Sequence, residues 1–137
     1  MSGDAARSWG RRLRWAHLVP WASFLVLYYE TLGKRKELRR PAAQTPVAAP
    51  KGSRPPWRTV VGVVRMAARL TPGNDTCLVR SFAAARMLRH YGYPAHVVIG
   101  VPETRIGAPG WEAHAWVEVA GAAVGRGDHQ EIVRLRP

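Results

Sequence analysis

Three residues of this 137-residue chain have the types and the order that nucleophilic catalysis requires: Cys77, His114 and Asp128. A nucleophilic cysteine needs a base that takes its proton, and the base needs a group that orients it. A cysteine, a histidine and an acid follow one another along the chain in that order. The three are therefore candidate catalytic residues, provided that the fold brings them together.

Cys77 is the only cysteine of the chain, and the sequence places it in the first turn of a helix. Asp75 or Thr76 can cap this helix by accepting hydrogen bonds from its first amides, and Gly92 is a typical C-terminal stop. Free amides and the helix dipole favour negative charge in the first turn, which favours a nucleophilic thiolate. A lone cysteine is more commonly a small buried apolar residue, so a partner elsewhere must decide its role.

His114 is the partner that the pattern favours, because it lies in a predicted strand. Two small residues, Ser81 and Ala84, share one line of the helix with Cys77, so a strand could approach the helix closely. That approach would place His114 within reach of the sulfur. Asp128 lies just past the next predicted strand, which completes an arrangement of the papain-like type.

Four other histidines compete for the role of base. His17 lies in the N-terminal segment, His90 shares an outer helical face with arginines, and His129 lies in a predicted loop. His96 belongs to another predicted strand and is the most serious rival.

Glu118 is the alternative acid, but it is four residues from His114 on the same strand and would lie beside it rather than behind it. A metal site built from Cys77, His114, Asp128 and His129 is the other use of these residue types. No paired-ligand spacing favours it, so we expect no metal.

Composition shifts divide the chain into three parts. Residues 1–40 form a predicted basic helical appendage, and 41–56 form a proline-rich linker. Residues 57–137 form the predicted domain. The apolar run of the appendage, 15–29, is shorter than the roughly 20 residues that span a bilayer, so we expect helices that pack on the domain or a partner.

The domain itself has the pattern of an α+β fold. An amphipathic helix over 57–70 precedes the Cys77 helix. Short apolar or alternating runs predict four strands that follow as an antiparallel meander: 95–101, 113–119, 122–124 and 132–135. Loops are expected at 102–110 and 125–129, and a tight turn at Ala120-Gly121.

Composition bounds the remaining function classes. One cysteine excludes an intramolecular disulfide framework and fits a reducing cytoplasm, where we place the protein. The net charge of +12 points to acidic partners. No zinc-finger spacing, P-loop, dinucleotide motif or nucleic-acid module is present. We therefore expect no cofactor, no nucleic-acid partner and no membrane contact.

Two segments carry a resemblance to a known family: residues 76–81, Thr-Cys-Leu-Val-Arg-Ser, and residues 113–119, Ala-His-Ala-Trp-Val-Glu-Val. Together with the helix to Gly92 and the strand after Pro94, they resemble the transglutaminase-like cysteine peptidases of lasso-peptide biosynthesis. These are the B proteins, here in the split form that carries only the protease half. The resemblance covers roughly residues 57–137.

The resemblance implies a transglutaminase-like or papain-like core, in which the cysteine-bearing helix packs on a small antiparallel sheet. Cys77 would be the nucleophile, His114 the general base and acid, and Asp128 the group that orients the imidazole. The implied activity is removal of the leader peptide from a ribosomally made lasso-peptide precursor. The implied partners are the precursor, a small leader-recognition protein and an asparagine-synthetase-like cyclase.

One departure is visible, because relatives commonly carry Asp-Gly where this chain has Ala120-Gly121. Two alternatives also stay open. A transglutaminase or acyltransferase would use the same thioester with an amine in place of water. A non-catalytic scaffold would only dock the precursor and the cyclase.

Overall fold

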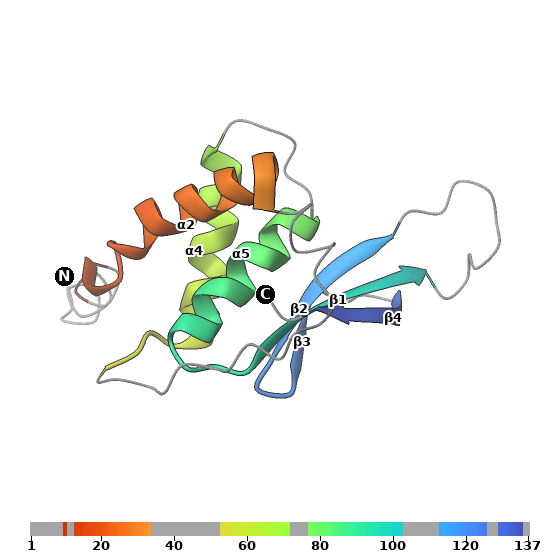
Figure 1. Ribbon diagram of the computed structural model, residues 1–137. Helices are drawn as coiled ribbons and strands as arrows, with labels where there is room; N and C mark the ends of the chain where they lie inside the picture. The colour runs from red at the N-terminus through yellow and green to blue at the C-terminus, as the bar shows by residue number, and fades with distance from the viewer. Residues whose placement is uncertain are drawn as a thin grey trace, which may run out of the picture.

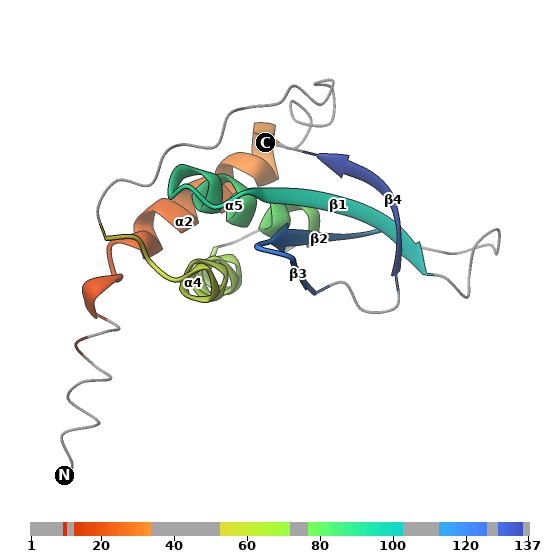
Figure 2. The ribbon, with the colours of Figure 1, turned by 90° about the horizontal axis from the view of Figure 1, so that it is seen from below.

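The computed structural model describes most of the chain, namely residues 10, 13–33, 53–71, 77–102, 113–125 and 129–135. Its helices are α2 (Leu18–Tyr28), the π-helix η1 (Tyr29–Gly33), α4 (Trp57–Leu70) and α5 (Cys77–His90). Its strands are β1 (Ala95–Pro102), β2 (His114–Val119), β3 (Ala122–Val124) and β4 (His129–Leu135). The helices gather on one side of the sheet, with α5 packed against β1 and β2 (Figures 1 and 2). The architecture is α+β, as predicted.

Helix α4 follows the amphipathic pattern of its sequence. Val60, Val64 and Ala67 are buried in the core, whereas Arg58 and Arg65 are exposed. Its bounds match the helix predicted over 57–70. The buried side faces α2 and α5, so α4 closes one side of the helical layer.

The C-terminal end of α5 confirms the predicted stop at Gly92, which has a φ of 84°. The amide of Tyr93 donates to the Leu88 carbonyl over 2.9 Å, and the amide of Gly92 donates to the Arg89 carbonyl over 3.1 Å. These two bonds form a Schellman motif, in which a residue with positive φ lets the chain satisfy the last carbonyls of a helix. The chain then turns directly into β1.

The sheet has the strand order β3-β2-β1-β4, and all its pairs are antiparallel. β2 and β3 form a hairpin whose turn is Ala120-Gly121, with φ values of 50° and 78°. The predicted tight turn is thereby confirmed. In the register between β1 and β2, Gly100 pairs with His114 and Ile99 with Ala115, so His114 begins β2 at the end of the sheet away from the hairpin turn.

The predicted meander is wrong for the last strand, because β4 pairs with β1 on the edge opposite β2. β4 also begins at His129, three residues before the predicted start, so His129 lies in a strand rather than in the predicted loop. The reason lies in β1, where the neighbouring residues Val97 and Val98 are both fully buried. A strand that is buried on both faces is typically central and pairs along both edges.

The N-terminal helix belongs to the same hydrophobic core as the helices after the proline-rich segment. Leu18, Leu25 and Tyr29 are buried in this core, and the Tyr29 ring stacks on Phe82 of α5 with ring centroids 5.4 Å apart. The helix of the predicted appendage thus packs on the predicted domain. The division of the chain at 41–56 stays a prediction, since only residues 53–56 of that linker lie within the described part.

None of the helices within the described residues combines the length and the apolar character needed to cross a membrane.

Candidate active site

Cys77 is the first residue of α5, as the sequence predicted, and its side chain is partly exposed. The predicted cap residues, Asp75 and Thr76, lie outside the described residues. The backbone amide of Ala115 in β2 donates to the Cys77 sulfur over 3.4 Å. The strand therefore reaches the start of the helix and presents a hydrogen-bond donor to the atom that would act as nucleophile.

Small side chains on α5 allow this close approach. Ser81 and Ala84 follow Cys77 along the helix and are buried against β2, where they face Ala115 and Val117 across a shared pocket. The Ser81 hydroxyl donates to the Cys77 carbonyl over 2.7 Å, which keeps its polar atom satisfied inside the helix. The predicted line of small residues thus does lie between the helix and the strand.

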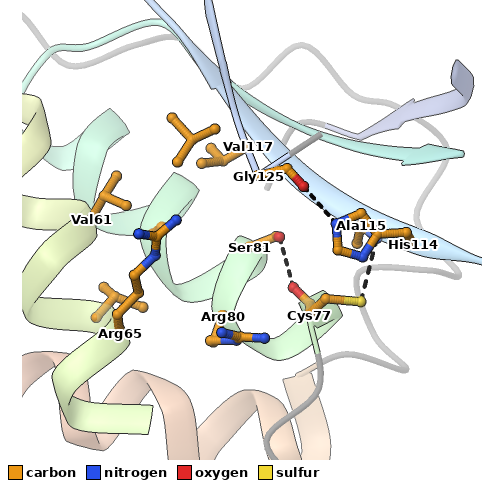
Figure 3. A pocket seen from close by; sticks show the side chains of 12 residues that line it. Val61, Arg65, Cys77, Arg80, Ser81, His114, Ala115, Val117 and Gly125 are labelled. Atoms are coloured by element: carbon orange, nitrogen blue, oxygen red, sulfur yellow. Dashed lines mark hydrogen bonds between the residues drawn. The ribbon is translucent and has the colours of Figure 1, made fainter. Parts of the chain in front are cut away.

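The pocket beside Cys77 has a volume of about 110 Å³ and is open to solvent on one side. Figure 3 shows it between α4, α5 and the β2–β3 hairpin. Its lining combines an apolar wall, two arginines and the candidate catalytic pair: Val61, Val64, Arg65, Cys77, Arg80, Ser81, Ala84, His114, Ala115, Val117, Val124 and Gly125. Among the described residues that line the pocket, the formally charged ones are Arg65 and Arg80, so this part of the lining favours negatively charged groups.

His114 lies next to Ala115 in β2 and lines the same pocket as Cys77. Its ring nitrogen Nε2 is 2.6 Å from the carbonyl oxygen of Gly125, the first residue after β3. One flat side of the imidazole packs near Trp116, with ring centroids 6.3 Å apart. In Figure 3 the imidazole is drawn between the Gly125 carbonyl and the Cys77 sulfur. Cysteine and histidine are thus brought together at one end of the sheet.

The rival histidines lie elsewhere among the described residues. His96 is three residues before Ile99, the β1 partner of Ala115, so it lies about 10 Å further along the sheet. His90 is at the far end of α5, where its ring contacts Trp21 at a centroid distance of 4.8 Å. None of these residues lines the pocket.

His17 and His129 also lie on elements away from the Cys77–His114 pair. His17 precedes α2 and is exposed near Trp15. The backbone of His129 begins β4, which is separated from β2 by β1. His114 is therefore the histidine that the described structure places beside Cys77.

The alternative acid, Glu118, is engaged away from the pocket. Its carboxylate forms an ion pair with Arg134 of β4 over 2.8 Å. It does not line the pocket that holds Cys77 and His114. Asp128 lies outside the described residues, so its role as orienting acid stays a prediction.

Two features of the site were not found from the sequence. The first is the contribution of α4, whose Val61, Val64 and Arg65 form one wall of the pocket. The second is the contact of a backbone carbonyl, that of Gly125, with the imidazole. An amphipathic pattern predicts that a helix packs on the core, but it does not predict which site the helix borders. A backbone carbonyl belongs to every residue, so the sequence does not indicate which one contacts the imidazole. Among the described residues no group of three or more His, Cys, Asp or Glu could hold a metal ion.

A family model described as the transglutaminase-like superfamily matches residues 15–137. Neither the curated proteins nor the solved structures contain a match to this chain. The matched residues include α2 as well as every residue that lines the pocket.

Proposed function

The chain belongs to the transglutaminase-like superfamily, which includes cysteine peptidases, and from that premise we propose that it is a cysteine peptidase with Cys77 as its nucleophile. The observation that carries the proposal is the meeting of α5 and β2. There the amide next to His114 contacts the Cys77 sulfur, and both side chains line one solvent-accessible pocket.

The proposed reaction has two stages. His114 takes the thiol proton of Cys77, and the sulfur attacks the carbonyl carbon of the scissile peptide bond. The C–N bond breaks as the imidazolium returns the proton to the leaving amine, which leaves a thioester on Cys77. Water, deprotonated by His114, then hydrolyses the thioester and releases the new carboxylate, after which the sulfur regains its proton.

The proposed substrate is the leader segment of a ribosomally made lasso-peptide precursor. The proposal relies on the sequence segments around Cys77 and His114 that resemble the B proteins of lasso-peptide biosynthesis. A small leader-recognition protein would present the leader, and an asparagine-synthetase-like cyclase would use the amine that cleavage frees. The proposed third catalytic residue is Asp128, as in the sequence-based prediction.

The test uses the purified full chain with a lasso-peptide precursor and a leader-recognition protein. Mass spectrometry of the products should show cleavage at one peptide bond, and Cys77→Ala should leave the precursor intact while its thermal unfolding matches that of the parent. Arg86→Met, at an exposed position of the same helix, is the matched control and should cleave normally. Cleavage by Cys77→Ala at the parental rate would overturn the proposal.

The same assay separates hydrolysis from acyl transfer. Added hydroxylamine or a primary amine traps the thioester of either enzyme, which shows that the thioester forms. The two enzymes differ when no such amine is added, because a transferase then gives an amide only with its own amine donor. A peptidase gives the free carboxylate in the absence of added amine. A protein that binds the precursor but never cleaves it, with or without the recognition protein, would be a scaffold.

A further inference from the structure

We propose that the pocket beside Cys77 is a subsite for an acidic side chain of the substrate, and that Arg65 of α4 binds its carboxylate. The assignment rests on the proposed function and adds a substrate class to it, namely precursors with Asp or Glu close to the scissile bond. The net charge of +12 attracts an acidic peptide to the chain over longer distances.

Arg65 lines the pocket from α4, whereas Cys77 and His114 line it from the starts of α5 and β2. In Figure 3 the Arg65 side chain extends from α4 into the space between this helix and the β2–β3 hairpin. A group that Arg65 binds therefore shares one pocket with the sulfur that would attack the substrate.

The Arg65 guanidinium is accessible to a ligand. The residue is exposed, and within the described part of the chain it has neither a hydrogen bond nor an ion pair. Arg80, the other arginine of the lining, is already engaged in an interaction of its own. A guanidinium donates through a planar fork of N–H groups that matches the two oxygens of a carboxylate. Arg65 is thus the cation that we assign to the substrate acid.

The walls of the pocket fit a single side chain. Four valines form the apolar part of these walls: Val61, Val64, Val117 and Val124. The methylene groups of an Asp or Glu would lie against this apolar surface while the carboxylate meets the guanidinium. The volume of about 110 Å³ is well below the roughly 300–1,000 Å³ of pockets that enclose a drug-sized ligand. Because Cys77 lines the same pocket, the side chain belongs to a residue near the scissile bond.

Helix α4 offers a matched pair of arginines for the test. Arg65 and Arg69 are both exposed and lie one turn apart, but of the two only Arg65 lines the pocket. Each is replaced by Gln, which removes the charge, and by Glu, which reverses it. The change in net charge is the same at both positions, so a difference between them reports the pocket. Substitutions at exposed positions rarely unfold a protein, and thermal unfolding checks that all four variants stay folded.

The first readout needs no substrate. Iodoacetate and iodoacetamide both alkylate the only cysteine of the chain, because its sulfur displaces iodide from the same carbon, but only iodoacetate carries a carboxylate. The ratio of the two rates cancels the intrinsic reactivity of the thiolate. Arg65→Gln should lower the ratio of iodoacetate to iodoacetamide rates about threefold, as expected for one exposed charge pair, and Arg65→Glu should lower it further. Both Arg69 variants should stay within about 1.5-fold of the parent, and equal ratios in Arg65→Gln and Arg69→Gln would overturn the proposal.

The second readout identifies the substrate residue. A lasso-peptide precursor, presented with a leader-recognition protein, is changed to Asp, Asn or Lys at one residue at a time on either side of the scissile bond. At one position the parent should cleave the Asp form about fivefold faster than the Asn form in kcat/KM, and added salt should reduce this preference by screening. Arg65→Gln should cleave both forms equally, and Arg65→Glu should prefer Lys. The Arg69 variants should keep the parental preference.

The preference of Arg65→Glu for Lys is a result that a merely structural role of Arg65 would not produce. A parent that does not distinguish Asp from Asn at any position, or an Arg65→Gln variant that still does, would overturn the proposal. The new carboxylate at the end of the released leader is a second source of the same chemistry. If only a leader that ends in a carboxylate, and not one that ends in a carboxamide, inhibits the parent through Arg65, and no side-chain preference is seen, the assignment to a side chain is wrong.

Failure of the subsite and failure of the peptidase function give different results. If Cys77→Ala still cleaves the precursor, the proposed function is wrong whatever the alkylation ratio shows. If cleavage requires Cys77 and the Arg65 variants match the Arg69 variants in both readouts, only the subsite is wrong.

Discussion

The two ends of α5 are built in opposite ways, although they belong to one fourteen-residue helix. The C-terminal end is closed by the Schellman motif around Gly92 and by the buried Arg89 guanidinium, which donates to the Ala95 carbonyl over 3.2 Å. Trp21 of α2 covers the same end through ring contacts with His90 and Tyr91. Burial there raises the pKa of Tyr91 above its ordinary value of 10.0.

The N-terminal end is open instead. Cys77 is partly exposed beside a pocket that reaches solvent, and its sulfur accepts a hydrogen bond from the Ala115 amide in the neighbouring strand. The difference indicates a division of labour along the helix: one end fixes α5 to β1 and α2, and the other presents a reactive atom to β2. Stability and reactivity should therefore respond to different substitutions.

The largest effect expected from the closed end is loss of stability. Leu88 is fully buried in the core, so Leu88→Ala should lower the free energy of unfolding by about 2–5 kcal/mol through lost burial and a residual cavity. Leu70→Ala, at a position that is 71% exposed, is the control and should be nearly neutral. Urea denaturation of both variants measures the difference.

Cleavage by the folded fraction of Leu88→Ala completes this comparison. The division of labour predicts a parental rate per folded molecule, whereas Cys77→Ala should be inactive yet stable. If Leu88→Ala remains folded but loses its activity, the closed end also controls the chemistry, and the comparison fails.

Local patterns in the sequence predicted the positions of Cys77 and His114, because each position depends only on the helix or strand to which the residue belongs. A cysteine at a helix start and a histidine at a strand start can be read from helical spacing and from alternation. The small residues Ser81 and Ala84 then indicated which side of the helix the strand would approach. The prediction that Cys77 and His114 are catalytic awaits the assays proposed above.

Long-range pairing was not predictable in the same way. The sequence of residues 129–135 does not indicate that this strand pairs with β1 rather than with β3. Strand order depends on which edge of the sheet the other elements leave uncovered. The contact of the Gly125 carbonyl with His114 was not predicted for a related reason. Every residue has a carbonyl, and the direction of this one depends on the backbone conformation of Gly125, whose φ is 81°. Sequence patterns thus locate side chains better than they locate main-chain partners.

An intermediate effect should come from Arg89, whose side chain is 6% exposed. Arg89→Met keeps the length of the side chain but removes the donor to the Ala95 carbonyl, which should cost about 1–3 kcal/mol if that carbonyl is left without a partner. Arg86→Met, on the exposed face of the same helix, should change stability by less than about 0.5 kcal/mol. Thermal and urea unfolding of the two variants compare the buried and exposed arginines directly.

An unchanged free energy of unfolding in Arg89→Met would mean that the hydrogen bonding of the guanidinium only balances the cost of burying its charge. The closed end of α5 would then depend on the Schellman motif and the aromatic contacts alone.

The smallest effect is expected at Ser81, which lies one turn after Cys77 in α5. Its hydroxyl bonds the Cys77 carbonyl over 2.7 Å, but that carbonyl has a second lone pair and, as a helical carbonyl, also accepts from the amide four residues on. Ser81→Ala therefore leaves no carbonyl unsatisfied, and alanine is the better helix former. Stability should change by less than about 1 kcal/mol, because the lost hydrogen bond and the gained propensity oppose each other.

The rate of Ser81→Ala is the more informative measurement, because the hydroxyl also lines the pocket. If the open end acts through the sulfur and the imidazole, Ser81→Ala should cleave the precursor within about threefold of the parent, with unchanged Cys77 alkylation. A loss of cleavage with normal alkylation would show that the hydroxyl contacts the substrate. A loss of both would show that it holds the sulfur in place, and the open end would then depend on the same packed interior as the closed one.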